Sequence, residues 1–230
     1  PVRVTYGSQN VKGGVKEGSP RFSPDSTCLA FTSNRSGRNN IWLINIERGG
    51  EARLITESNN GISSITWAPD GKHLAFVSRE PKTEPCNEAE ARQSKDVTVV
   101  TRLRYKANGV PYVTDPRALQ LFMINIDTGE VKQLTFGEYD CFSPAFSPDG
   151  KSLAFVSCRE ANCETHMIPD LWVLALENGK LTRLTHGQGP AAAPSYSPDG
   201  RFIAYIGSLR KDVTAAKSEI LVVPASGGHI

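Results

Sequence analysis

Four residues near the middle of the chain, Arg102, Arg104, Tyr105 and Lys106, are candidates for binding a substrate. They lie in the stretch KDVTVVTRLRYKANGVPYV (95–113), in which apolar and polar residues alternate. Successive side chains of an extended strand point to opposite sides, so Arg102, Arg104 and Lys106 share one face. A guanidinium group suits a carboxylate or a carbonyl oxygen, because it presents N–H donors in a rigid fork. The pattern predicts a cationic arm that binds a carboxylate or a carbonyl oxygen of a substrate.

The same arm has a purely structural interpretation. Asn108-Gly109 is typical of a tight hairpin turn, after which VPYV can return as the partner strand. Charges along an exposed hairpin edge discourage aggregation, and the hairpin of 95–113 could also contact a second copy of the chain. Both interpretations stay open.

A second group with possible chemistry is Cys158, Cys163 and His166, with Asp170 nearby. The C-x4-C-x2-H spacing is not typical of a structural zinc site, and no fourth ligand is evident. We therefore expect an ordinary loop, with no metal and no other cofactor.

The cysteines form an odd set without a regular framework spacing. They are Cys28, Cys86, Cys141, Cys158 and Cys163. We expect reduced thiols in a cytoplasmic protein, with a Cys158–Cys163 disulfide as the alternative.

The overall composition excludes two classes of partner. The formal net charge is only +2, whereas a dedicated nucleic-acid binder usually shows a strong basic excess. No apolar run approaches the roughly 18–20 residues that a membrane span needs. We expect neither nucleic acid nor a membrane as a partner.

The candidate residues interrupt a repeated sequence. The string FSPDGKSLAFVS (146–157) recurs in close versions at 22–33, 67–78 and 196–207. The prolines of the repeated Pro-Asp pair follow one another at intervals of 45, 79 and 50 residues. Two intervals match the length of a propeller blade, and the long one contains an insertion at 79–119.

Each repeat contains a turn, after a short first strand, that the residue types explain. Ser147 suits the first position of a type I turn, Pro148 presets φ at the second, and Asp149 fits the third. Gly150 supplies a positive φ at the fourth. The first repeat has Ser26 instead of glycine, so we expect its turn to be strained or slightly different.

The strand after the turn is apolar on both faces, with Leu153 and Phe155 on one side and Ala154 and Val156 on the other. Such a strand must lie inside a stack of sheets. Four short strands per repeat of about 40–50 residues predict an all-β fold, the β-propeller.

The chain supplies four blades' worth of strands. We expect a single propeller domain or segment over 1–230, with repeats at about 19–56, 62–135, 141–185 and 192–230. Strand 1–6 would belong to a preceding blade of a ring of about seven, because both ends look cut within a blade. Alternatively, strand 1–6 completes the last blade and closes a four-bladed ring.

The string PxFSPDGKxLAFVS followed by xLWVLxLxxGxLxRLT resembles the TolB-like propeller repeat, which also forms the N-terminal propeller of prolyl-oligopeptidase-family serine peptidases. The insertion with RLRYKANG and then QLFMINIDTGEVKQLTFGEYD (120–140) looks like bacterial acylaminoacyl-peptidases and related dipeptidyl peptidases. The resemblance implies a propeller that caps an α/β-hydrolase domain, restricts entry to short peptides and lines the substrate cavity. The parent enzyme would hydrolyse short or N-blocked peptides through an acyl-enzyme.

This chain has no G-x-S-x-G nucleophile elbow, since GISSI (61–65) lacks the second glycine. We therefore expect no catalytic residue in it and no activity from it alone, with the hydrolase domain of the same parent protein as its partner. The irregular loops, which share one face of a propeller, should meet that domain. The alternative is a stand-alone TolB-like propeller that binds a protein partner.

Overall fold

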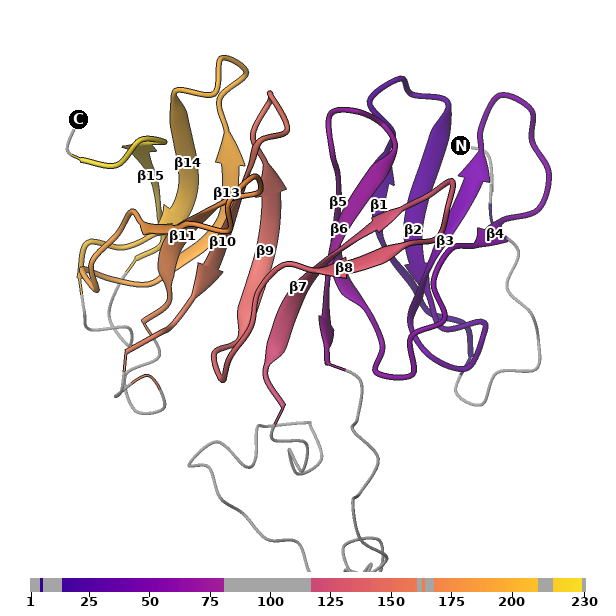
Figure 1. The fold of residues 1–230 in the computed structure, drawn as a ribbon, viewed down its shortest axis with the longest axis horizontal. Coiled ribbons are helices and arrows are strands. Elements are labelled where there is room, and N and C mark those ends of the chain that lie inside the picture. Colours follow the sequence, from indigo (N-terminus) through magenta and orange to yellow (C-terminus); the bar gives the residue numbers. More distant parts are fainter. Residues whose placement is uncertain are drawn as a thin grey trace, which may run out of the picture.

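The structure is a computed structural model that describes residues 5, 14–80, 117–160, 163, 168–210 and 217–228. It contains four antiparallel sheets (Figure 1). The first holds β1 (Glu17–Phe22), β2 (Cys28–Ser33), β3 (Asn40–Asn45) and β4 (Arg53–Leu54). The second holds β5 (Ser63–Trp67), β6 (His73–Arg79), β7 (Leu119–Asn125) and β8 (Val131–Gln133). The third holds β9 (Cys141–Phe146), β10 (Ser152–Ser157), β11 (Asp170–Ala175) and β12 (Leu181–Arg183). The fourth holds β13 (Ala191–Tyr196), β14 (Phe202–Gly207) and β15 (Glu219–Pro224).

The sheets stand side by side as blades of an arc, with the first and fourth at its two ends (Figure 1). Neighbouring blades contact each other through their first strands, β1, β5, β9 and β13. Among the described strands, none of the first blade contacts the fourth. The predicted all-β propeller fold is confirmed, while the number of blades in the complete ring stays a prediction. No helix in the described part of the chain has the length and apolarity of a membrane span.

The repeated turn has the predicted geometry. The N–H of Gly150 donates to the carbonyl of Ser147 at 2.9 Å, which closes the four-residue turn. Gly150 has a φ of 71°. Ser26 is held at a φ of 63°, a region that costs an L-residue roughly 1–2 kcal/mol. The strain predicted for the first repeat is thus confirmed.

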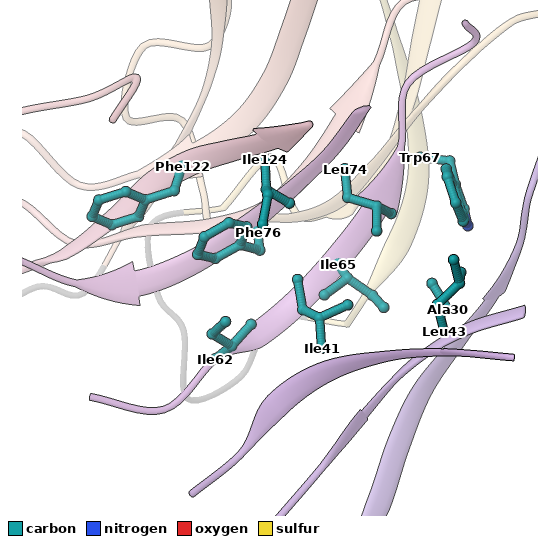
Figure 2. Close-up of a cluster of buried hydrophobic side chains, with 10 residues drawn as sticks. All are labelled: Ala30, Ile41, Leu43, Ile62, Ile65, Trp67, Leu74, Phe76, Phe122 and Ile124. Carbon is teal, nitrogen blue, oxygen red and sulfur yellow. The ribbon is translucent and has the colours of Figure 1, made fainter. Parts of the chain in front are cut away.

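The second strands of the two inner blades are buried on both faces because each of these blades is packed between two neighbours. Leu153, Ala154 and Phe155 of β10 have no exposed surface. Between the first two blades, side chains from facing strands interleave (Figure 2). There Phe76 of β6 and Phe122 of β7 stack with ring centroids 5.5 Å apart. Full burial of an aliphatic or aromatic side chain is worth about 1.5–3 kcal/mol, so these contacts hold the blades together.

The fourth strands are short, with two residues in β4 and three each in β8 and β12. In the second blade β8 ends at Gln133, because the hydroxyl of Thr135 replaces the next backbone partner. Thr135 Oγ1 accepts from the N–H of Leu121 at 2.9 Å and donates to Gln120 Oε1 at 2.7 Å. The first and third blades repeat this arrangement with Thr56 and Thr185. The threonine fixes the point at which the chain leaves one blade for the next.

Candidate functional site

The irregular segments gather on one face of the arc. We call this the loop face and define it by 34–39, 55–62, 134–140, 158–160, 184–190 and 208–210. It contains the loops between second and third strands and the connections between blades. Strand β6 ends and β7 begins on this face, which forms the lower edge in Figure 1. The predicted substrate-binding residues Arg102, Arg104, Tyr105 and Lys106 fall in 81–116, outside the described residues.

A cleft of about 770 Å³ lies between the first two blades and reaches the loop face. Phe76 and Phe122 line it from β6 and β7, and Ser58, Asn59 and Asn60 line it from the connection to the second blade. Its volume is in the range typical of small-molecule sites. Apolar walls with amides and a hydroxyl at one side suit an apolar side chain attached to a peptide backbone.

A network of hydrogen bonds joins the two ends of the insertion beside this cleft. Asn60 Nδ2 donates to the carbonyls of Arg79 and Glu80 at 3.2 and 3.0 Å. Asn60 Oδ1 accepts from Arg117 Nη2 at 3.1 Å, and Arg117 Nη1 also donates to the carbonyl of Glu80. Glu80 Oε1 accepts from Gln133 Nε2 at 2.6 Å. One asparagine therefore ties both ends of the insertion to the connection between the first two blades.

Arginines stacked on tryptophans form a second feature of the loop face. Arg35 lies 4.9 Å from the ring centroid of Trp42, and Arg159 lies 5.3 Å from that of Trp172. These distances are within the range of cation–π attraction. Neither arginine was predicted from the sequence as a site residue. The sequence did contain a signal for them. In the first and third blades, an arginine follows the last serine of the second strand by two residues, and the third strand contains a tryptophan. The second blade has Glu80 and Phe122 at these two positions.

Arg183 joins the third blade to the loop face through two carboxylates. Its Nη2 donates to the buried Asp170 and to the exposed Glu160, the latter at 2.7 Å. Partial burial lowers the pKa of Arg183, but the hydrogen bond to Glu160 and the charge of Asp170 outweigh that effect, so the pKa is raised. The guanidinium stays charged and both acids remain paired.

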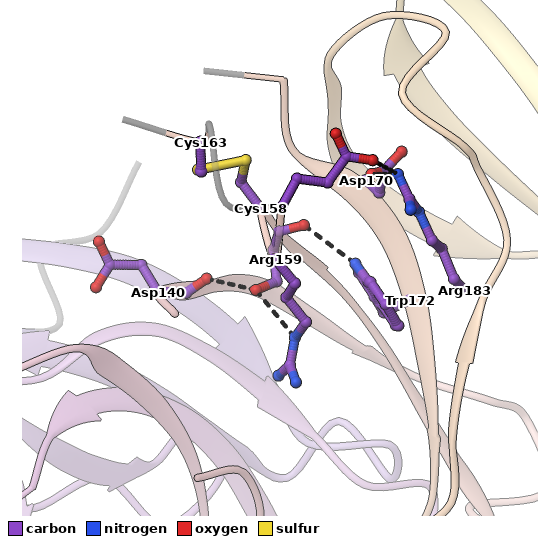
Figure 3. The surroundings of a disulfide bond; sticks show 9 residues. Asp140, Cys158, Arg159, Cys163, Asp170, Trp172 and Arg183 are labelled. Carbon is purple, nitrogen blue, oxygen red and sulfur yellow. Dashed lines mark hydrogen bonds and ion pairs between the residues drawn. A yellow bond between two sulfur atoms is a disulfide. The ribbon is translucent and has the colours of Figure 1, made fainter. Parts of the chain in front are cut away.

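Cys158 and Cys163 form a disulfide on the loop face (Figure 3). This corrects the expectation that all the cysteines are reduced. A turn in which the N–H of Cys163 donates to the carbonyl of Glu160 at 3.0 Å reverses the chain. The two Cα atoms are consequently 5.8 Å apart, a separation that a disulfide spans. Neither sulfur is then available as a thiolate metal ligand. Among the described residues, Cys28 and Cys141 are free thiols.

Comparisons with known proteins agree with this architecture. A family model described as the TolB beta propeller domain matches residues 83–230. A Bacillus subtilis protein named uncharacterized peptidase YuxL is 36% identical over 145 residues, which are 62% of this chain and 22% of that protein. This chain thus spans about a fifth of that relative.

Two solved structures share the fold. A putative TolB from Agrobacterium tumefaciens matches with a TM-score of 0.62 and 20% identity, over 90% of this chain and 61% of that chain. An acylaminoacyl peptidase in complex with Z-Gly-Gly-Phe-chloromethyl ketone matches with a TM-score of 0.64 and 18% identity, over 90% and 30% of the two chains. At these identities the likeness concerns the fold alone.

Proposed function

Because this chain belongs to the TolB beta propeller domain family, we propose that it is the propeller part of a serine peptidase of the prolyl-oligopeptidase family. The observation that supports this most is the 36% identity to a relative described as a peptidase. The fold shared with an acylaminoacyl peptidase is consistent with it. In this proposal the chain contributes no catalytic group, and an α/β-hydrolase domain of the same parent protein performs the hydrolysis.

The propeller would restrict the hydrolase to short peptides and line part of its substrate cavity. We place the contact with the hydrolase domain on the loop face, because the irregular segments concentrate there on an otherwise regular scaffold. The cleft between the first two blades would accept an apolar side chain of the peptide. The insertion would supply Arg102, Arg104, Tyr105 and Lys106 as further contacts, or would pair two copies of the chain through the hairpin of 95–113.

Active-site labelling tests the proposed enzyme class. An antibody against this chain would capture the natural protein, which is then treated with a fluorescent fluorophosphonate. We expect a labelled serine in the captured protein and no label on the purified 230-residue chain. A captured protein that contains this chain but no reactive serine would instead favour the TolB-like interaction propeller, for which the family match also speaks.

Substitution of the insertion arginines tests the peptide contact. We expect the double change Arg102→Ala and Arg104→Ala, introduced into the whole parent enzyme by recombinant expression, to raise KM for short peptides with free carboxylates. Arg48→Ala, in the exposed turn between β3 and β4 on the opposite face, is the matched control. Unchanged peptide kinetics in the double variant would leave only the structural interpretation of the hairpin.

The cytoplasmic location predicted from the cysteines also stays a proposal. Structural disulfides are rare in the cytosol, so the Cys158–Cys163 bond argues for an oxidising compartment. Cell fractionation with detection of this chain distinguishes the cytoplasm from an oxidising compartment.

A further inference from the structure

The guanidinium of Arg159 lies among three aromatic rings on the loop face. Arg159 follows the end of β10 by two residues and is half-buried. Its guanidinium carbon is 5.9, 5.7 and 5.3 Å from the ring centroids of Tyr139, Phe155 and Trp172. Its Nε donates to Ser157 Oγ at 3.3 Å. These contacts fix the plane of the group in surroundings of low polarity, where an interaction with an anion is stronger than in water.

Arg159 differs from the comparable arginines in having no carboxylate partner among the described residues. Arg35 has the equivalent position in the first blade, with the same stacking and the same serine hydrogen bond, but it pairs with Glu17. Arg183, on the other side of Trp172, pairs with Asp170 and Glu160. Among the described residues, no carboxylate therefore balances the charge of Arg159, whereas the neighbouring arginines are paired.

Neither of the groups next to Arg159 supplies a negative charge. Arg159 Nη2 lies 3.7 Å from Cys141 Sγ, but burial raises the pKa of the Cys141 thiol, which stays neutral. The carboxylate of Asp140 points away from Arg159 (Figure 3) and accepts from the N–H of Leu119 at 2.7 Å. The guanidinium has five N–H donors. The donors that contact neither Ser157 Oγ nor Cys141 Sγ have no partner among the described residues and can bind a ligand.

The loop that holds Arg159 is restrained at two points. The Cys158–Cys163 disulfide begins at the preceding residue. Trp172 Nε1 donates to the carbonyl of Ser157 at 3.1 Å, which anchors the end of β10 under the loop (Figure 3). A group held in advance loses little conformational freedom on binding, which favours affinity. Tyr139 is 39% exposed, so this side of the guanidinium is open to the loop face, while the fully buried Phe155 closes the inner side.

We propose that Arg159 is a binding residue for a carboxylate group carried by a peptide, with the planar guanidinium as the donor and the three rings as its frame. The chemistry of recognition, a carboxylate, follows from the unpaired guanidinium, whereas the peptide as its carrier rests on the proposed function. A C-terminal carboxylate and an acidic side chain share this chemistry, and the experiment separates them.

The test is an NMR titration of the ¹⁵N-labelled 230-residue chain that follows the Nε–Hε resonance of Arg159, assigned with Arg159→Lys, and in every variant also the indole N–H resonance of Trp172, whose ring lies beside the guanidinium. The ligands are acetylated trialanine with a free carboxylate, the same peptide as its amide, and acetyl-Ala-Glu-Ala amide. We expect the free acid to bind about tenfold more tightly than the amide, as suits a hydrogen bond between charged groups. Tighter binding of the glutamate peptide than of trialanine amide would extend the site to acidic side chains.

Matched variants decide whether Arg159 is responsible. Arg159→Gln should abolish the preference for the acid, and Arg159→Lys should keep part of it, since a lysine retains the charge without the fork. Arg35→Gln, which removes a similar charge from the paired equivalent position, should leave the preference unchanged. If Arg159→Gln unfolds, the comparison of Arg159→Lys with the unmodified chain still gives the answer. Equal binding of acid and amide to the unmodified chain, or an equal loss in Arg35→Gln, would overturn the proposal.

The two proposals can fail separately. A captured protein without a reactive serine, together with acid-selective binding that depends on Arg159, would remove the peptidase and leave the carboxylate site. A labelled serine together with equal binding of acid and amide would support the peptidase and remove the carboxylate site.

Discussion

At the scale of single residues, Trp42 and Trp172 occupy the same strand position in two blades but differ in hydrogen bonding. Trp172 Nε1 donates to the carbonyl of Ser157, whereas the buried Nε1 of Trp42 has no partner among the described residues. A buried donor without a partner loses its hydration without compensation. The change of tryptophan to phenylalanine therefore removes a favourable hydrogen bond at Trp172 and a buried donor without a partner at Trp42.

We expect Trp172→Phe to reduce the free energy of unfolding by about 1 kcal/mol more than Trp42→Phe does. Both changes remove the same indole, so their difference isolates the hydrogen bond and the second stacked arginine. Urea denaturation of the two variants measures it. Equal losses would mean that Trp42 has a partner that compensates its buried N–H.

The turn aspartates make the fold sensitive to acid. The hydroxyl of Ser147 and the N–H of Lys151 donate to Asp149 Oδ1 at 2.6 and 3.0 Å, and these bonds lower the pKa of Asp149. Equivalent serines lower the pKa of Asp25 and Asp199. A carboxyl whose pKa is lower in the folded state stabilises the fold above its unfolded pKa, about 3.9, and loses that contribution as the pH falls through the folded pKa.

The acid sensitivity should be visible in Asp149→Asn. We expect this variant to melt below the unmodified chain at pH 6, with the gap narrowing as the pH is lowered from 4 towards 2. Thermal unfolding followed by circular dichroism over this range measures the gap. Asp127→Asn is the control for the loss of a surface charge, because its carboxylate accepts no hydrogen bond among the described residues. A gap for Asp149→Asn that is constant with pH would contradict the linkage.

At the scale of elements, the first strand of every blade contains a β-bulge at the same place. Ser19, Ser64, Ser143 and Ala193 all have a positive φ, between 46° and 51°, where the register of β1, β5, β9 and β13 shifts. A bulge bends a strand and increases its twist. Since these strands make the contacts between blades, the bulge helps to set the orientation of each blade, and non-glycine residues hold it under strain.

Glycine at a bulge should relieve this strain. We expect Ala193→Gly to raise the free energy of unfolding by up to about 1 kcal/mol. Glycine removes the cost of the left-handed conformation in the folded chain, and this gain exceeds the stabilisation of the unfolded chain by its larger conformational entropy. Ala192→Gly, one residue earlier and without a positive φ, should instead lower it by about 0.5–1 kcal/mol. Chemical denaturation compares them, and the same sign for both changes would show that the bulge is not strained.

At the scale of the whole molecule, one position of the third strand is buried in the first three blades and exposed in the fourth, at the end of the arc. Ile41, Leu121 and Leu171 are fully buried in the first three blades, whereas the corresponding Ile220 of β15 is 73% exposed. Ile206 is paired with Ile220 and is also exposed. The sequence position is the same in each blade, and the difference is that no described blade follows the fourth.

An apolar patch on an edge strand should promote association of the 230-residue chain. We expect sedimentation velocity to show concentration-dependent association that Ile220→Lys reduces, with little change in melting temperature because the side chain is exposed. Phe136→Lys is the control, since Phe136 is 67% exposed but lies in the connection after β8. Association that both changes reduce equally would indicate a general effect of charge and not a surface at β15.

The sequence determined the features that repeat, because each depends on local chemistry. The turn from Ser147 to Gly150, the doubly buried strand at Leu153–Val156 and the strain at Ser26 all follow from residue types at fixed spacing. The candidate site was predicted less completely. The arginines placed in the insertion lie outside the described residues, and the sequence analysis missed Arg159.

Tertiary structure alone decided which groups are paired. Arg35 and Arg159 follow their strands at the same distance, yet within the described ranges Arg35 meets a carboxylate and Arg159 does not, since Glu17 lies beside Arg35 on the neighbouring strand. The disulfide formed because a turn at Glu160 reversed the chain. Pairing and burial depend on which segments become neighbours, and a residue such as Ile220 has the same sequence signal whether or not a blade covers it.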